Sequence, residues 1–270
     1  MKLRSWSLWI LAFVLVTLAA VYQRMTGPTY PIRAAVKIGD TDYRFRLARS
    51  SGAAGDEKIP LAVPDTRVRG VMEFRRFKSN DAWSTQELER QGDYLVATIP
   101  HQPPAGKVMY RIGLLSDAQP VWLTVEPVVI RFKGDVPATV MIPHVAFMFL
   151  AMLFSTRAGL EALLKRPQTL RLTVWTVITL GIGGMILGPV VQKLAFGAYW
   201  TGWPFGSDLT DNKTVLAFVF WLLAWWRLRK HPESRAWALI ASVVLFLVYM
   251  IPHSVLGSEI DYTRLPPQKG

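Results

Sequence analysis

Residues 138–155 read ATVMIPHVAFMFLAMLFS, a run of eighteen residues that contains no Asp, Glu, Lys or Arg. A helix needs about 20 mainly apolar residues to cross the ~30 Å hydrocarbon core of a bilayer. One comparable run precedes this stretch, at residues 6–22, and three follow it, at 172–191, 209–228 and 236–255. The sequence therefore predicts five transmembrane helices, with a long polar segment between the first and the second.

The composition also indicates a membrane protein. The chain is 51% hydrophobic, has a mean hydropathy of +0.24, and concentrates its apolar residues in long runs. Its net charge of +12 is compatible with a nucleic-acid partner, but about half of the excess lies in two short loops between apolar runs. We therefore expect no nucleic-acid binding. The absence of cysteine excludes disulfides, thiolate metal sites and haem attachment through Cys-x-x-Cys-His.

The first apolar run follows two basic residues, Lys2 and Arg4. A cleaved signal peptide is one interpretation, but no small-x-small cleavage site follows cleanly. We predict that residues 1–23 form an uncleaved membrane anchor with its N-terminus in the cytoplasm.

Residues 24–137 contain no membrane-length apolar run and are rich in strand-forming patterns. Residues 83–91 carry at most one helical turn. Gly and Pro clusters separate short alternating runs, and Gly39-Asp40 resembles the turn of a hairpin. The predicted strands lie at 32–38, 43–47, 68–77, 94–99, 108–115 and 121–132. This pattern predicts an extracytoplasmic antiparallel β-sandwich inserted between helices 1 and 2, and so an α+β membrane protein.

Loop charges give the predicted orientation. The loops at 157–171 and 227–235 each contain four Lys or Arg and one acidic residue, whereas loop 192–213 and tail 256–270 each sum to zero. Positively charged loops remain in the cytoplasm. We therefore expect a multi-pass protein of the bacterial inner membrane, with residues 138–270 forming a four-helix transmembrane domain and the C-terminus outside.

The tetrapeptide Met-Ile-Pro-His occurs twice, at 141–144 and 250–253. The predicted topology places both copies in helices, with His144 and His253 at one depth near the outer face. Imidazole ligates haem iron and other transition metals, and a preceding proline bends a helix. His144 and His253 are therefore candidate ligands of a haem or a transition metal. The alternative is that each ring makes an interhelical hydrogen bond at the membrane interface.

The outer loop Tyr199 to Asp208 is rich in aromatic residues and glycine. We predict that Trp200, Trp203 and Asp208 help to bind the cofactor, since glycines allow the backbone to approach a planar ligand closely. Aromatic residues at this depth also anchor proteins to the bilayer surface. Asp208 is, in addition, well placed to be the N-cap of the following helix.

Residues 199–226 resemble the tryptophan-rich loop of membrane proteins that handle haem in cytochrome c maturation. The matching elements are Trp200, Gly202, Trp203, Asp208, Trp221, His144 and His253, although Pro204-Phe205-Gly206 interrupts the pattern. The whole arrangement also resembles a family of conserved bacterial multi-pass membrane proteins, which implies an architecture and no activity.

Two functions follow from these patterns. The first is non-covalent binding of haem or a metal near the periplasmic face, in redox-complex assembly or electron transfer. The second is a non-catalytic membrane scaffold or assembly protein, embedded in the lipid bilayer, whose β-sandwich docks a periplasmic or membrane protein partner. No nucleophile motif, P-loop or dinucleotide fingerprint is present, so an enzyme is not expected. Transport is disfavoured because no pair of interrupted helices is evident.

Overall fold

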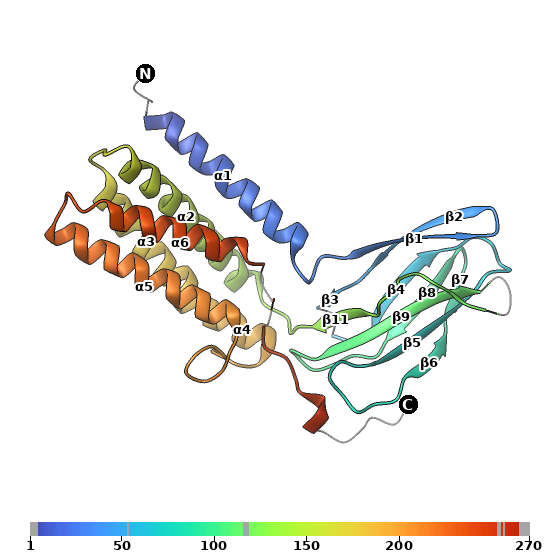
Figure 1. Ribbon diagram of the computed structural model, residues 1–270. Coiled ribbons are helices and arrows are strands. Elements are labelled where there is room, and N and C mark those ends of the chain that lie inside the picture. Colours follow the sequence, from blue (N-terminus) through green and yellow to red (C-terminus); the bar gives the residue numbers. More distant parts are fainter. Residues whose placement is uncertain (1–4, 53, 116–118, 253–254, 256, 265–270) are drawn as a thin grey trace. The chain divides into compact units, whose positions relative to one another are not determined.

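The computed structural model describes residues 5–52, 54–115, 119–252, 255 and 257–264 (Figure 1). The chain divides into two compact units. Unit 1 comprises Met1–Pro28, Val136–Leu194 and Ala198–Ser258. Unit 2 comprises Thr29–Asp135, Ala195–Gly197 and Glu259–Gly270.

Unit 1 is a bundle of helices. They are α1 (Ser5–Thr26), α2 (Ala138–Leu163), α3 (Thr169–Leu180), the π-helical segment η1 (Gly181–Leu187), α4 (Gly188–Phe196), α5 (Leu209–Lys230) and α6 (Ala236–Met250). Within the described residues, three stretches are long and apolar enough to cross a membrane, namely Ser5–Thr26, Ala138–Leu163 and Thr169–Phe196. The helix α6 is apolar but has 15 residues. The helix α5 has 22 residues and carries charged side chains in its first and last turns.

Small residues allow the helices of unit 1 to pack closely. Gly159 of α2 lies against Ser242 of α6, where a Cβ atom on Gly159 would come within 2.7 Å of the Ser242 Cβ. The Ser242 hydroxyl donates to the carbonyl oxygen of Ser155 over 2.9 Å. In lipid, close packing of small residues is a main source of helix association, so these contacts define how α2 and α6 meet.

Polar contacts define the directions of the helices. The Arg157 guanidinium, in the last third of α2, donates to the hydroxyl of Ser5 at the start of α1 over 3.3 Å. The Gln23 amide, near the end of α1, donates to the carbonyl oxygen of Tyr249 at the end of α6 over 2.8 Å. The helix α1 is therefore antiparallel to α2 and parallel to α6.

Unit 2 consists mainly of strands. They are β1 (Ile32–Ile38), β2 (Thr41–Leu47), β3 (Ser50–Ser51), β4 (Glu57–Ala62), β5 (Arg69–Arg76), β6 (Ser84–Glu87), β7 (Glu89–Gln91), β8 (Tyr94–Ile99), β9 (Lys107–Leu115), β10 (Val121–Trp122) and β11 (Val128–Phe132). The described strands form a two-stranded sheet β1-β2, a six-stranded sheet β3-β11-β9-β5-β6 with β10 beside β9, and a three-stranded sheet β4-β8-β7. Among the strand pairs of the described residues, β3 and β11 alone are parallel.

One hydrophobic core joins the three sheets. Alternate residues of the longer strands point into it, as the burial of Tyr43, Phe45 and Leu47 along β2 shows. Met72 and Ile112, from neighbouring strands of the six-stranded sheet, are fully buried in the same cluster. This shared core makes the strands one folding unit.

Two segments distant in sequence from the strands also belong to unit 2. The backbone N–H of Gly134 donates to the carbonyl oxygen of Ala195 over 2.9 Å, and the Arg131 guanidinium lies 3.8 Å from the centre of the Phe196 ring. After the last helix, the Tyr262 hydroxyl donates to the side-chain oxygen of Gln102 over 3.0 Å. The chain therefore returns to unit 2 after α4 and again after α6.

An ion-pair cluster strengthens the contact between the segment after α6 and the strands of unit 2. The carboxylate of Glu259 pairs with the ammonium groups of both Lys78 and Lys107. Partial burial alone would raise the pKa of Glu259, but hydrogen bonds from the two lysines outweigh it and hold that pKa below its usual value. The tail is therefore fastened to unit 2 by both charge and hydrogen bonding.

The predicted hairpin is confirmed: β1 and β2 pair in antiparallel register around Gly39, whose φ is +58°. The sequence patterns missed β4, which contains Pro60, and also β6 and β7, where at most a helical turn was expected. Their short lengths and polar residues give weak alternation.

The expectation that both Met-Ile-Pro-His copies lie in helices is wrong for the second copy. The helix α6 ends at Met250, and Ile251 has an extended backbone with φ −72° and ψ 116°. A proline disfavours the helical conformation of the residue before it, and Pro252 follows Ile251 directly. Pro143, by contrast, lies inside α2.

Replacing Ile112 by Ala should destabilise unit 2, because the side chain is 0% exposed in the shared core. Such large-to-small changes cost about 2–5 kcal/mol. We expect the apparent Tm of the detergent-solubilised protein, followed by β-type circular dichroism, to fall by several degrees. Val121→Ala is the control, since Val121 is 44% exposed. An equal change in both variants would contradict the assignment of the core.

Candidate functional site

The carboxylate of Asp211, in the first turn of α5, organises one polar end of unit 1. It accepts hydrogen bonds from the backbone N–H groups of Thr201, over 2.7 Å, and Gly202, over 2.9 Å, and from the side-chain amide of Gln192, in the middle of α4, over 3.0 Å. A Cβ atom on Gly202 would lie 2.6 Å from the Asp211 Cβ, so glycine is needed for this approach. Asp211 is 6% exposed. Its bonds satisfy a charge that would otherwise be costly to bury.

Asp208 is the N-cap of α5, as the sequence predicts, because its side chain accepts from the Thr210 N–H over 2.8 Å. Its second oxygen accepts from the N–H and the hydroxyl of Ser258, over 2.7 and 2.8 Å. Burial alone would raise the pKa of Asp208, but these hydrogen bonds outweigh it and hold that pKa below its usual value. Asp208 thus ties the start of α5 to the segment that follows α6.

Hydrogen bonds hold the backbone of the aromatic loop between α4 and α5, while the side chains at its tip are exposed. The Trp200 indole donates to the carbonyl oxygen of Trp203 over 3.1 Å, and the Trp203 N–H donates to the side-chain oxygen of Asn212 over 2.6 Å. The exposed fractions of Tyr199, Trp203 and Phe205 are 60%, 78% and 82%. The loop backbone is therefore fixed, while these three rings point outward.

His144 makes an interhelical contact. Its Nδ1 lies 3.0 Å from the carbonyl oxygen of Gly183, in η1, and the ring is partly buried. Short π-helical segments often occur at functional sites. If Nδ1 donates to this carbonyl, Nε2 is left as the ring nitrogen able to accept a proton or a metal.

Three of the five predicted cofactor residues, Trp200, Trp203 and Asp208, share the aromatic loop, and His144 lies against η1. The fifth, His253, lies outside the described residues. Among the residues that the structure describes, no group of three or more His, Asp or Glu side chains is placed to hold a metal ion.

A buried ion pair in unit 1 was not predicted. The side chains of Arg157 and Glu161 are 0% and 1% exposed and pair across one turn of α2. A second oxygen of Glu161 accepts from the Gln168 backbone N–H over 3.2 Å. By sequence alone, both residues belong to a basic loop at 157–171. Their four-residue spacing directly after an apolar run is the signal that could have identified the pair.

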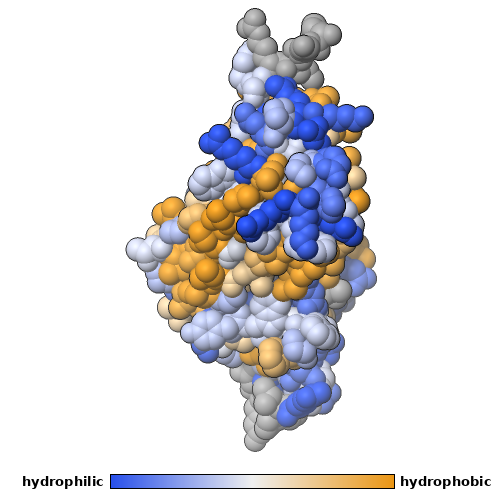
Figure 2. Space-filling model, turned by 90° about the vertical axis from the view of Figure 1, so that its left-hand side faces the viewer, coloured by the Kyte–Doolittle hydropathy of each residue, from blue (hydrophilic) through white to orange (hydrophobic). Residues whose placement is uncertain are grey.

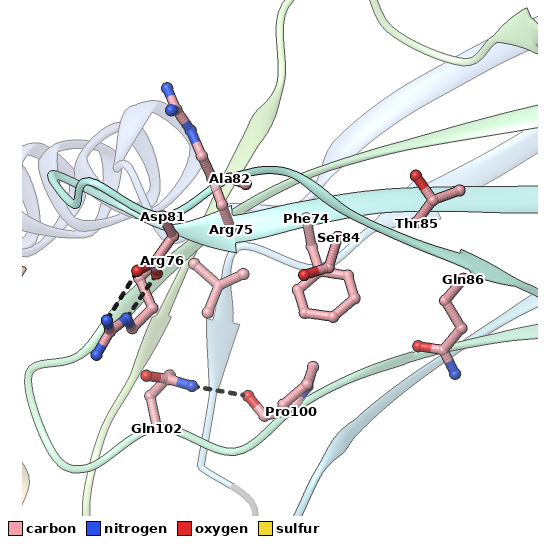
Figure 3. A pocket seen from close by; sticks show the side chains of 11 residues that line it. Phe74, Arg75, Arg76, Asp81, Ala82, Ser84, Thr85, Gln86, Pro100 and Gln102 are labelled. Atoms are coloured by element: carbon pink, nitrogen blue, oxygen red, sulfur yellow. Dashed lines mark hydrogen bonds and ion pairs between the residues drawn. The ribbon is translucent and has the colours of Figure 1, made fainter. Parts of the chain in front are cut away.

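A cavity of about 340 Å³ opens at the β6 edge of the six-stranded sheet in unit 2 (Figure 3). Phe74, Ser84 and Gln86 direct their side chains toward it, and Pro100 and Gln102 lie opposite. No sequence motif marks these residues, because the site forms only when the end of β5, the strand β6 and the segment after β8 come together.

One end of this cavity is closed by a charged pair. Arg76 forms a two-point ion pair with Asp81, with nitrogen–oxygen distances of 2.7 and 2.8 Å. The guanidinium also lies 4.7 Å from the centre of the Tyr262 ring. The Arg76–Asp81 pair is electrically balanced, and the rest of the lining is mainly hydroxyl, amide and apolar groups, with Arg75 as a further cation.

Comparison of the chain with protein-family models, with curated proteins and with solved structures gave no match. Function is therefore inferred from the geometry of the chain itself, in particular from the fixed aromatic end of unit 1 and the edge cavity of unit 2.

Replacing Asp211 by Ala should loosen the aromatic loop, because three donors lose their acceptor. Hydrogen bonds to charged groups contribute about 1.5–3 kcal/mol each, so we expect the amides of Thr201 and Gly202 to exchange with deuterium at least about tenfold faster. Asn212→Ala, which removes the single bond to the Trp203 N–H, should have a smaller effect. Unchanged exchange in Asp211→Ala would show that the carboxylate does not hold the loop.

The stabilisation that Asp208 provides should depend on pH. A carboxylate whose pKa is lowered on folding stabilises the protein above its unfolded pKa, near 3.9, and loses that contribution as the pH falls through the folded pKa. The difference in apparent Tm between the wild type and Asp208→Asn should therefore be largest near about pH 6 and shrink toward about pH 3. A difference that is constant over this range would contradict the ionised cap.

Proposed function

We propose that the chain is a non-catalytic assembly or scaffold protein of the bacterial inner membrane. In this proposal five helices cross the bilayer, the N-terminus is cytoplasmic and the C-terminus periplasmic. The sheets of unit 2 form a periplasmic β-sandwich that docks a partner protein. The observation that carries the docking role is the cavity beside the edge strand β6.

The path of the chain supports five crossings. It lies in unit 2 after α1, again at residues 195–197, and again from residue 259. The helices α2 and α3–η1–α4 separate the first two visits, and α5 and α6 separate the last two. Two crossings return a chain to the side from which it started, so α5 and α6 cross together or not at all. Asp208, at the start of α5, is hydrogen-bonded to Ser258, in the segment after α6. This contact favours a hairpin in which both helices cross the bilayer.

The distribution of charge supports the orientation. Residues 157–171 and 227–235, which cover the α2–α3 and α5–α6 connections and the flanking helix ends, each have an excess of three positive charges, four Lys or Arg against one acidic residue. Figure 2 shows hydrophilic side chains gathered at helix ends on this side, with hydrophobic side chains along the flanks. Loops with such an excess remain in the cytoplasm, so the opposite end, with the aromatic loop, is placed in the periplasm.

The strand β6 offers an open sheet edge. It pairs with β5 on one side, and no strand in the described part of the chain pairs with its other side. An edge strand presents unpaired backbone N–H and C=O groups, to which an extended peptide can add as a further strand. The partner would therefore present an extended segment.

The lining of the cavity indicates which side chains the extended segment of the partner would carry. Phe74 lies opposite Ser84 in the register and is only partly buried, whereas Met72, two residues earlier on the same face, is fully buried. An added strand with an apolar side chain at this position would cover the Phe74 ring. The neighbouring Gln86 amide would bond to the uncharged backbone of this strand.

Cross-linking in cells tests the docking role. A photoreactive residue in place of Gln86 should give one discrete protein adduct, and the same residue at Lys58, exposed on β4, should not. Ser84→Trp fills the cavity and should reduce the adduct at least about tenfold, as expected for loss of one buried anchor. Glu87→Trp, at an exposed position of the same strand that is not among the residues lining the cavity, is the matched control. Equal adducts in both variants would exclude the cavity as the docking site.

Non-covalent binding of haem or a transition metal is the second candidate. The observation that favours it is the hydrogen bond from His144 to a backbone carbonyl, the arrangement by which metal-ligating imidazoles are oriented. In this alternative, His253 supplies a second nitrogen, and the aromatic loop covers the ligand.

An absorption spectrum of the protein, purified in mild detergent from cells grown with iron, separates the two candidates. A Soret band that is lost in His144→Ala but not in His101→Ala would establish the haem site; His101 lies in unit 2. A spectrum without such a band, together with no metal by elemental analysis, would leave the scaffold role alone.

A further inference from the structure

The outward face of the β1–β2 hairpin is a row of cations. In the antiparallel register Arg33 lies opposite Arg46, Ala35 opposite Arg44, and Lys37 opposite Asp42. All six side chains are exposed. We call Arg33, Lys37, Arg44 and Arg46 the basic face; Asp42 is the one acidic residue among the pairs that form it.

The fold does not need this charge. Within the described part of the chain, no carboxylate forms an ion pair with any residue of the basic face. Like charges directly opposite on neighbouring strands destabilise a sheet, so the Arg33–Arg46 pair opposes folding slightly. A ligand of opposite charge would remove this repulsion.

The basic face cannot turn inward. The alternate residues of the same strands, including Ala34 and Phe45, are 6% and 5% exposed in the core of unit 2. The period of two along a strand therefore fixes the four cations on the outer surface.

The chain also keeps the basic face near the membrane. The helix α1, which is long and apolar enough to cross a bilayer, ends at Thr26, and β1 begins at Ile32. Five residues separate them, and fully extended chain spans at most about 3.5 Å per residue. The root of the hairpin, where Arg33 and Arg46 lie, is thus tethered within roughly 20 Å of the helix end, whatever the orientation of unit 2.

We propose that the basic face binds the phosphate headgroups of anionic phospholipids and so holds the hairpin against the bilayer. Guanidinium groups bind phosphate oxygens in a two-point geometry, and basic clusters next to a transmembrane helix are attracted to anionic lipid. Arg33 and Arg46 contribute most, because Arg33 is the basic-face residue nearest to α1 along the chain and Arg46 lies directly opposite it. This proposal requires that α1 crosses a bilayer and is independent of the cavity beside β6.

A single label on the basic face tests the proposal. The chain contains no cysteine, so Ala35→Cys carries one environment-sensitive fluorophore on this face. The full-length protein is placed in nanodiscs of phosphatidylcholine alone, or with about a third phosphatidylglycerol. Phosphatidylglycerol should shift the emission to the blue and reduce quenching by acrylamide. About 1 M salt should reverse both changes, because it screens charges beyond about 3 Å. A label at Ala62→Cys, exposed on β4, should not respond.

Charge removal gives the decisive comparison. Arg33→Gln/Arg46→Gln should weaken the lipid response roughly fivefold for each charge removed, and its apparent Tm should equal or exceed that of the wild type because the repulsion is relieved. Lys58→Gln/Arg69→Gln removes two exposed charges elsewhere in unit 2 and should keep the full response. A response that is equal in the two lipids, or is lost equally in the two double variants, would overturn the proposal.

Discussion

A backbone that enters hydrocarbon must satisfy all its hydrogen-bonding groups within a helix, because lipid offers no partners. Each apolar helix of unit 1 therefore carries the chain across the bilayer or stays out of it. This constraint matters because the chain returns to unit 2 at residues 195–197 and 259–264. In the proposed topology, helices between such returns cross in pairs, and the basic segments 157–171 and 227–235 lie on the opposite side from the aromatic loop and the tail.

The aromatic end of unit 1 is primarily a device that fixes structure. Asp211 accepts hydrogen bonds from the loop backbone and from Gln192 of α4, and Asp208 accepts from Ser258. These bonds hold α4, α5 and the segment after α6 together. The rings of Trp203 and Phe205 point outward from this support. Aromatic residues in such positions suit the bilayer interface. The basic face of the β1–β2 hairpin suits its charged layer, and both features favour a protein held closely at one membrane surface.

The sequence predicted long regular elements well and the sites less well. The apolar runs and the Gly39 hairpin were found because periodicity and turn chemistry are local. The end of α6 was misplaced because hydropathy continues through Ile251, whereas Pro252 stops the helix. Asp208 was correctly identified as a cap. The Arg157–Glu161 pair and the cavity around Phe74 escaped notice, since burial and proximity between distant strands follow from tertiary packing that one sequence does not display.

The central claim is that unit 2, the aromatic loop and the tail share one side of a membrane that the chain crosses five times. Single cysteines in the cysteine-free chain test it most directly. In cells whose outer membrane has been permeabilised, a membrane-impermeant maleimide should label Ala62→Cys and Ser207→Cys at once, and His231→Cys only after the inner membrane is broken. Labelling of His231→Cys in intact cells, or protection of Ser207→Cys, would contradict the account.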